Sequence, residues 1–272
     1  MKVAVCNIRS NDFEEKLLTS VMNTGFVVIT HHGIDGGLIR EAQSMWREFF
    51  LQRQIYKDTF VNQKDSNLGY KGMGTETAVG SKVADIKEFY HWKPGGHLPL
   101  PVDMMTQHLF FLLEDVGMQI LTVLEKRAKA NYVNNCSQSD NTLLRTLYYP
   151  ALKNHDTSNG AVRAAAHEDI NHITLLVAAS APGLQVMDLK GDWHDVPHEA
   201  NSITVNIGDM LQLASDGLFK STTHRVINPP DTNSDRISMP LFIHPHSYVM
   251  LAPGKTAGQF LKERIDEIYG RK

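Results

Sequence analysis

Beyond Asn141 the chain consists of short apolar runs separated by turn-forming residues, and this pattern constrains the fold more than any other feature. The runs have the length of β-strands, several are rich in β-branched residues, and Gly, Pro, Asn and Asp stand between them. Such a pattern predicts an antiparallel sandwich or a jelly-roll barrel. The runs cover residues 143–149, 161–169, 173–179, 183–189, 202–207, 209–215, 222–227 and 236–243.

The second of these runs leads into HEDINH, residues 167–172, which places two histidines and two carboxylates in six positions. On a helix, His167 and His172 would diverge by roughly 140°, so they could not share one ion as the histidines of HExxH zinc proteases do. On a strand, side chains alternate, so His167 and Asp169 point to one face while Glu168 and His172 point to the other. The useful pair of metal ligands is therefore His167 and Asp169.

A third ligand is expected on a strand that is distant in sequence but adjacent in space. His224 fits, because it stands in STTHRVINP within a predicted strand and has β-branched neighbours. Two imidazoles and one carboxylate suit iron and leave coordination positions open for oxygen chemistry. A structural zinc site would close four ligands, usually with Cys, whereas Cys6 and Cys136 lack metal-binding spacing and are interpreted as reduced thiols.

Arg236 and Ser238 follow His224 in the segment DRISMPLF, and their separation of two places them on one face of a strand. Arginine offers a planar fork that matches a carboxylate, and serine adds a hydroxyl donor. An arginine directed into a barrel lacks water, so it requires an anionic partner, which a ligand can supply. The pair therefore predicts a clamp for an acid group.

Taken together, these motifs resemble the Fe(II)- and 2-oxoglutarate-dependent dioxygenases, specifically the isopenicillin N synthase-like family. The resemblance spans nearly the whole chain and rests on the order of its motifs more than on any single one. In the second half the motifs are HEDIN (167–171), NIGDML (206–211), STTHRV (221–226), RIS (236–238) and GLQVMDLKGDWHDVP (183–197). In the first half they are TGFVVITHHGI (24–34), GYKGMGTE (69–76) and DIKEFYHW (85–92).

The resemblance implies a double-stranded β-helix in which His167, Asp169 and His224 hold Fe(II). It also implies that Arg236 and Ser238 bind the distal carboxylate of 2-oxoglutarate, the cosubstrate, with O2 as the oxidant and ascorbate as a candidate reductant. The expected fold class is thus mixed α and β, with packing helices mostly from the N-terminal half.

Two further residues become candidates for cosubstrate binding. Many family members carry Asn, an aromatic residue and Tyr before a Pro, and LYYP (147–150) keeps Tyr149 but has Leu147 in place of the Asn. Arg145 lies two residues before Leu147 on the same strand face and is the second candidate. Core packing is the competing interpretation for Tyr148 and Tyr149.

The implied activity is oxidation of a small-molecule substrate, with hydroxylation as the default and desaturation or cyclisation as other outcomes. One alternative is an Fe(II) oxidase or cyclase of the isopenicillin N synthase type, which works without 2-oxoglutarate but also carries an RxS pair. A non-catalytic barrel that binds metal or a small acid is a second alternative. A hydrolytic zinc enzyme is third, and it would need a general base where Glu168 faces away.

Residues that contact the primary substrate are harder to select. Asn171 would share the face of Asp169 if the strand continued, and Phe89 and Tyr90 could form a wall beside the mouth; a strand-ending Asn and core aromatics are the competing interpretations. The remaining histidines of interest, His31, His32, His91, His97 and His172, are expected on the surface or in loops.

The rest of the chain predicts helices near 13–21, 38–50, 102–124 and 260–268, a strand at 26–30 and an extended piece at 87–92. We expect one oxygenase domain, 1–272, with a mainly helical part (1–140), a jelly-roll core with the metal site (141–250) and a C-terminal helix (251–272). A net charge of −3 and no long apolar run lead us to expect a cytoplasmic protein that binds neither nucleic acid nor membrane. The oligomeric state stays open.

Overall fold

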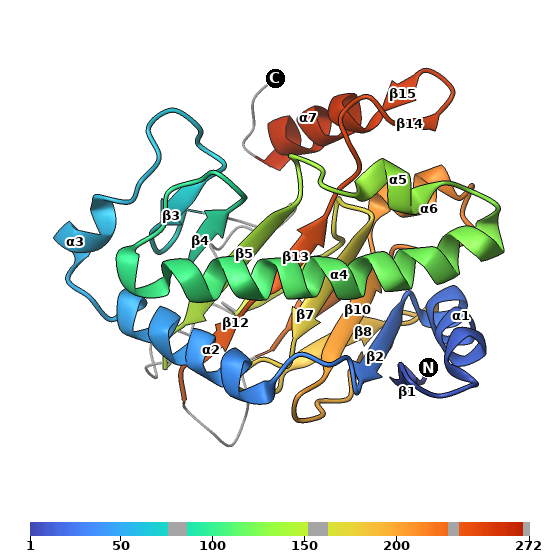
Figure 1. Cartoon of the computed structure of the whole chain (residues 1–272), viewed down its shortest axis with the longest axis horizontal. Helices are drawn as coiled ribbons and strands as arrows, with labels where there is room; N and C mark the ends of the chain where they lie inside the picture. The colour runs from blue at the N-terminus through green and yellow to red at the C-terminus, as the bar shows by residue number, and fades with distance from the viewer. Residues whose placement is uncertain (76–85, 152–162, 228–233, 269–272) are drawn as a thin grey trace.

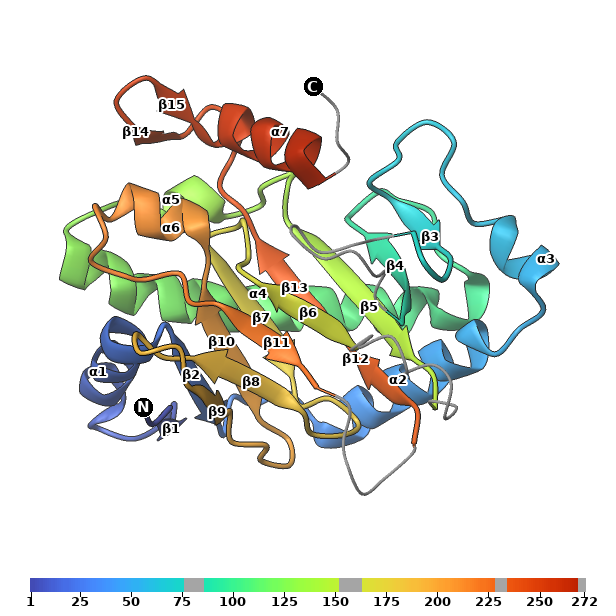
Figure 2. The same cartoon turned by 180° about the vertical axis from the view of Figure 1, so that it is seen from behind.

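A computed structural model describes residues 1–75, 86–151, 163–227 and 234–268. Two β-sheets face each other, and helices cover the outer side of the larger sheet (Figures 1 and 2). This arrangement confirms the prediction of a sheet-rich core with packing helices.

The larger sheet has the strand order β1-β2-β10-β7-β13-β5-β4-β3, with β12 paired to β5, and among these described strands only β1 and β2 pair in parallel. Its strands are β1 (Val5–Asn7), β2 (Phe26–Thr30), β3 (Gly69–Lys71), β4 (Glu88–Trp92), β5 (Leu143–Tyr149), β7 (Ile173–Val177), β10 (Ile203–Ile207), β12 (Arg236–Ser238) and β13 (Pro240–Ile243). The smaller sheet has the order β6-β11-β8-β9, from β6 (Ala164–His167), β11 (His224–Val226), β8 (Leu184–Met187) and β9 (Trp193–Asp195). A hairpin of β14 (Met250–Ala252) and β15 (Lys255–Thr256) stands apart.

The helices are α1 (Phe13–Thr24), α2 (Gly36–Phe50), α3 (Gln54–Asp58), α4 (Asp103–Ala128), α5 (Tyr132–Cys136), α6 (Asp209–Ala214) and α7 (Ala257–Ile268), with a 3-10 turn η1 (Leu100–Val102). Helix α4 runs across the larger sheet with α2 beside it (Figure 1). Its Gly117 permits close approach, because a Cβ there would stand 2.2 Å from Ile243 Cδ1 of β13. Within the described ranges, no helix combines the length and apolar character needed to cross a membrane.

Strand β2 shows why the central strands are continuous apolar runs. Val27 and Ile29 pack into the core beneath the helices, whereas Phe26 and Val28 pack against Val186 of β8 in the smaller sheet. Alternate side chains thus enter two different apolar layers, so both faces of the strand are buried. This burial on both faces explains why FVVIT lacks polar alternation.

One segment differs in type from the sequence prediction. Residues 209–215 were expected to form a strand but contain helix α6, because the amides of Asp209 and Met210 donate to the carbonyls of Asp169 and Ile170 instead of to a neighbouring strand. Strand β2, strand β4 and helix α7 lie at or near the predicted ranges 26–30, 87–92 and 260–268, and the described part of the first 140 residues adds β1 and β3 to the larger sheet.

A buried ion pair fastens α3 to the edge of the larger sheet. Lys57 Nζ lies 2.6 Å from Glu88 Oε2 of β4, and both side chains are less than a tenth exposed. The ammonium also donates to the Phe50 carbonyl at 3.0 Å, and the Tyr70 hydroxyl of β3 donates to the same carboxylate oxygen. The Glu88 carboxylate therefore connects α3, β3 and β4.

We predict that Glu88→Gln lowers the free energy of unfolding by about 3–5 kcal/mol, because it leaves a buried ammonium without its counter-charge. The matched control is Glu263→Gln, which breaks an exposed pair with Lys255 and should cost about 1 kcal/mol or less. Urea unfolding of both variants measures the difference, and equal losses would contradict the prediction.

Candidate active site

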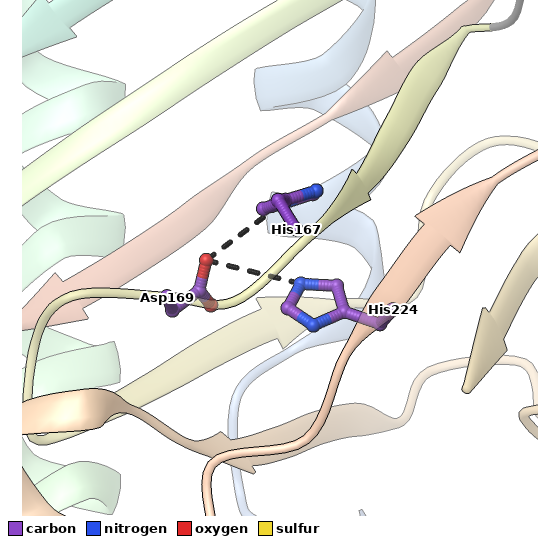
Figure 3. A group of neighbouring side chains, drawn as sticks. All are labelled: His167, Asp169 and His224. Carbon is purple, nitrogen blue, oxygen red and sulfur yellow. Dashed lines mark ion pairs between the residues drawn. The ribbon is translucent and has the colours of Figure 1, made fainter. Parts of the chain in front are cut away.

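Three potential metal ligands converge where the two sheets meet. His224 of β11 pairs directly opposite His167, the last residue of β6, and Asp169 lies just beyond the strand end. The Nε2 atoms of both histidines lie 3.8 Å from Asp169 Oδ1, and the two ring centres are 4.4 Å apart. Figure 3 shows the carboxylate oxygen directed toward both imidazoles. The register between β6 and β11 therefore brings together residues 57 positions apart in sequence.

Backbone carbonyls fix the orientation of the two imidazoles. His167 Nδ1 lies 2.8 Å from the Ala165 carbonyl, and His224 Nδ1 lies 3.1 Å from the Thr222 carbonyl. Because a carbonyl oxygen can only accept, Nδ1 carries a proton in each ring, and in the neutral tautomer that this selects the lone pair is on Nε2. Both lone pairs thus face Asp169, as metal-binding histidines require.

Asp169 is held by the larger sheet. Its Oδ2 accepts hydrogen bonds from Thr174 Oγ1 at 2.6 Å and from Asn206 Nδ2 at 2.8 Å. Burial raises the pKa of this carboxyl, but the two histidines and the two hydrogen bonds outweigh burial, so the pKa lies below its ordinary value. The carboxylate is therefore ionised, with Oδ1 available to a cation.

This donor set fits Fe(II). Two imidazoles and one carboxylate leave further coordination positions open, which is the arrangement typical of non-haem iron oxygenases. His167 keeps 40% of its side chain exposed, so the site opens to solvent on its side, whereas Asp169 and His224 are buried. Among the described residues, no other group of three His, Cys, Asp or Glu side chains has this spacing.

Glu168, between the two ligands, accepts a hydrogen bond from Thr223 Oγ1 at 2.6 Å and is exposed. It does not converge with the three donor atoms. Glu168 is therefore not placed to act as the general base that a hydrolytic zinc enzyme would need beside the metal.

Arg236, Ser238 and Tyr149 come together on two paired strands. Arg236 stands opposite Tyr149 in the β12–β5 pairing, and its guanidinium carbon lies 5.3 Å from the centre of the Tyr149 ring. Arg236 is 2% exposed; its Nε donates to the Ala181 carbonyl at 3.0 Å, while its Nη1 has no hydrogen-bond partner. A buried cation with an open donor suits a carboxylate ligand. The cavity beside Arg236 is lined by Leu176, Ala181, Leu184, Val196 and Thr204.

Arg145 lies in a different group. It stands four residues before Tyr149, about 13 Å along the strand, and its Nε donates to His91 Nε2. Its guanidinium carbon lies 4.6 Å from the ring centre of Phe89 and 5.6 Å from that of Phe242. The structure thus places Arg145 against Phe89, whose ring also packs with Leu147 and Tyr149.

Two predicted substrate residues lie outside the site. Asn171 is fully buried, and its amide donates to the Ile173 carbonyl at 2.6 Å and to Thr174 Oγ1 at 3.1 Å. The expected alternation fails because β6 ends at His167. Tyr90 faces the helices, where it packs against Trp46 and donates to the His97 carbonyl at 2.8 Å. Both differ from the sequence prediction, and Asn171 instead supports Thr174.

Sequence reasoning also missed several buried polar residues. Thr174 and Asn206, which hold Asp169, look like ordinary strand residues, although Asn206 opens the motif NIGDML. His32 and His172 lie in loops as expected, although both are buried, whereas His91 is buried within β4. Only the packing of these segments in three dimensions reveals that the side chains are buried.

His172 is the most deeply buried of these histidines. Neither ring nitrogen has a hydrogen-bond partner, the Tyr132 ring stands edge-on at 5.7 Å, and burial with nearby His244 lowers its pKa to about 3. Burial likewise lowers the pKa of His244 to about 4. Both side chains are therefore neutral at pH 7, and protonating either one works against the folded state.

The comparisons with known proteins agree with this geometry. Residues 131–245 match the family model of the 2OG-Fe(II) oxygenase superfamily, and residues 7–107 match the model described as non-haem dioxygenase in morphine synthesis N-terminal. A crystal structure of a Shewanella oneidensis protein assigned as an oxygenase has a TM-score of 0.87 and 38% identity, covering 99% of both chains.

Two further relatives extend the likeness. Proline hydroxylase buaE of Petromyces alliaceus is 28% identical over 245 residues, which are 81% of this chain and 76% of that protein. A full-length Neurospora crassa protein, crystallised with alpha-KG, is 23% identical with a TM-score of 0.82, covering 96% of this chain and 95% of that chain, and so shares the fold.

A jelly roll with a His-Asp-His centre defines a non-haem iron oxygenase. The chain belongs to the 2OG-Fe(II) oxygenase superfamily. It is an oxidoreductase that uses Fe(II), 2-oxoglutarate and O2, and the predicted fold class, a mixed α and β jelly roll, is confirmed.

We predict that Thr174→Val weakens Fe(II) binding by about 10- to 100-fold, because Asp169 loses a hydrogen bond that orients it. The matched control is Thr122→Val on α4, where the hydroxyl only donates to the Met118 carbonyl at 2.8 Å. Anaerobic titration with Fe(II) measures both affinities, and equal affinities in the two variants would count against the role of Thr174.

A second prediction concerns acid stability. The folded pKa of His172 lies below the unfolded value of 6.5, so the unfolded chain binds more protons and stability falls as pH drops from about 6.5 toward 3. His172→Phe removes this titrating group, so its free energy of unfolding should fall less steeply than that of the wild type as pH drops, by about 1.4 kcal/mol per pH unit. Urea unfolding of both proteins between pH 7.5 and 4.5 gives the two slopes, and parallel slopes would refute the assignment.

Proposed function

We propose that His167, Asp169 and His224 bind the catalytic Fe(II). The converging Nε2 and Oδ1 atoms support this assignment, since they form the only such group among the described residues. Bound Fe(II), together with 2-oxoglutarate and O2, would supply the oxidising power to break a substrate C–H bond. The protein's own contribution is to orient the two imidazoles with Nε2 toward Asp169 and to hold the carboxylate ionised before the metal arrives.

We propose further that Arg236, Ser238 and Tyr149 bind the distal carboxylate of 2-oxoglutarate. The single observation that carries this assignment is the buried guanidinium of Arg236, whose Nη1 has no partner inside the protein. A carboxylate would satisfy that donor, and the apolar lining of the adjacent cavity would keep water away from the ion pair.

The reaction that we favour is hydroxylation of a small organic molecule, with desaturation and cyclisation as related outcomes. A hydroxylase among the relatives supports this choice. The alternative within the fold, an oxidase of the isopenicillin N synthase type, would take electrons from the substrate and release no succinate. Stoichiometric succinate release separates the two, because only the first couples substrate oxidation to decarboxylation of 2-oxoglutarate.

Arg145, Phe89 and Phe242 form the wall at which we place the primary substrate. Phe242 pairs opposite Thr174, the residue that holds Asp169, so this group stands level with the metal ligands. Arg145 and Phe242 are half-buried, whereas Phe89 is 1% exposed and supports the guanidinium from behind, so the wall presents one aromatic ring and one positive charge. We therefore move Arg145 from the cosubstrate site to the substrate site.

The cellular setting is also part of the proposal. Cys6 and Cys136 are free and buried, as is usual for proteins of a reducing compartment, and this supports a cytoplasmic location. With a net charge of −3, we propose a small-molecule substrate and no nucleic-acid or membrane partner.

The decisive test is anaerobic reconstitution with Fe(II) followed by 2-oxoglutarate. We expect the weak visible absorption band that Fe(II) acquires when a 2-oxo acid binds to it. Asp169→Ala should abolish Fe(II) binding and turnover while the far-ultraviolet circular dichroism spectrum is retained. Arg236→Ala should keep Fe(II) but require at least about tenfold more 2-oxoglutarate, since a charge-assisted hydrogen bond is lost. Wild-type behaviour in both variants would overturn the assignment.

A further inference from the structure

A second arginine near the cosubstrate clamp is as deeply buried as Arg236. Arg163 immediately precedes β6 and is 1% exposed. Its Nη2 donates to the carbonyl of Ser234, whereas its Nε and Nη1 are buried without any hydrogen-bond partner. The described protein therefore uses only one of the three guanidinium nitrogens, which is little for a residue with a purely structural role.

Arg163 adjoins the same strands as the proposed clamp. Ser234, which accepts its hydrogen bond, is two residues before Arg236, and Arg236 stands opposite Tyr149. Burial lowers the pKa of both arginines, and the charge of Arg163 lowers that of Arg236 further. Two guanidiniums and one phenol therefore form a single cluster at this end of the barrel.

The cluster has an excess of positive charge. Among the described residues, no carboxylate oxygen lies within 4.0 Å of either guanidinium. The Tyr149 phenol and, more weakly, the Asp235 carboxylate raise the pKa of Arg163, but Asp235 Oδ2 lies 2.7 Å from Arg47 Nε and accepts from the Tyr148 hydroxyl at 3.4 Å. Two adjacent buried cations without a counter-ion are costly, and an anionic ligand would relieve that cost.

We propose that Arg163 is a second cation of the 2-oxoglutarate site and donates to the distal carboxylate together with Arg236, Ser238 and Tyr149. A carboxylate offers about four lone-pair positions, which matches one donor from each of these four side chains. This inference rests on the proposed function, because it takes the ligand from the Arg236 assignment. The protein should therefore bind a 2-oxo acid that has a second carboxylate much more tightly than one that lacks it.

The test compares two 2-oxo acids on the Fe(II)-loaded protein without oxygen. 2-Oxopentanoate has the chain length of 2-oxoglutarate but ends in a methyl group. In Arg163→Met we expect the Kd of 2-oxoglutarate to rise about 10- to 100-fold and that of 2-oxopentanoate to stay unchanged. The control is Arg225→Met on β11, whose guanidinium stacks 4.0 Å from the Trp193 ring centre, and both Kd values should match wild type.

Thermal unfolding of the ligand-free protein separates ligand binding from a structural role. Because Met removes a buried cation that lacks a counter-ion, Arg163→Met should unfold at the wild-type temperature or higher, and the stabilisation by 2-oxoglutarate should shrink. If Arg163 only supports the Ser234 carbonyl, Arg163→Met should instead melt at a lower temperature and keep the full stabilisation by 2-oxoglutarate. That result would overturn the proposal.

Two further variants keep the outcome interpretable. If Arg163→Met does not fold, Arg163→Lys retains the charge without the planar fork, and it should raise the Kd of 2-oxoglutarate by a smaller factor; an unchanged Kd would refute the proposal. Arg236→Ala tests the parent assignment. If Arg236→Ala weakens 2-oxoglutarate binding but Arg163→Met does not, only the role of Arg163 fails, whereas an unchanged Kd in Arg236→Ala removes the proposed function itself.

Discussion

The hydrogen bonds from Thr174 and Asn206 to one oxygen of Asp169 are the interaction on which the site depends. Thr174 and Asn206 stand directly opposite each other on β7 and β10 of the larger sheet, whereas Asp169 continues from β6 of the smaller sheet. The larger sheet therefore fixes the carboxylate that the histidines of the smaller sheet face. Gly208 completes the connection, because a Cβ there would meet the Asn171 carbonyl oxygen at 2.1 Å.

Protein groups stabilise the buried charge at the metal end of the barrel interior but leave buried charge without partners at the proposed cosubstrate end. At the metal end, the Asp169 carboxylate has two donors on one oxygen and two imidazoles near the other, so its charge is stabilised without a ligand. At the proposed cosubstrate end, Arg163 and Arg236 keep three nitrogens without partners. Buried donors without hydrogen-bond partners do not stabilise the folded protein. The anion that we propose they bind explains why these nitrogens are buried there.

The sequence pointed to the metal site through an assumption that holds only in part. Alternation along a strand selected His167 and Asp169, yet β6 ends at His167, and Asp169 reaches the site from the following loop. The same assumption placed Asn171 in the site, where the structure does not. Arg163 could not have been recognised, since a single arginine before a strand looks like a surface residue until burial and missing partners are known.

The N-terminal half supplies one side of the proposed substrate wall, and this side can change independently of the metal ligands. Phe89 belongs to β4, which the Lys57–Glu88 pair ties to α3, whereas the proposed metal and cosubstrate residues all lie on or beside strands after Leu143. Substitutions between α3 and β4 can therefore alter the shape of the wall without moving Asp169. If the substrate binds at this wall, the segment from α3 to β4 helps to determine which substrate is accepted, although it carries no iron ligand. The ion pair of Glu88 with Lys57 holds this segment in position.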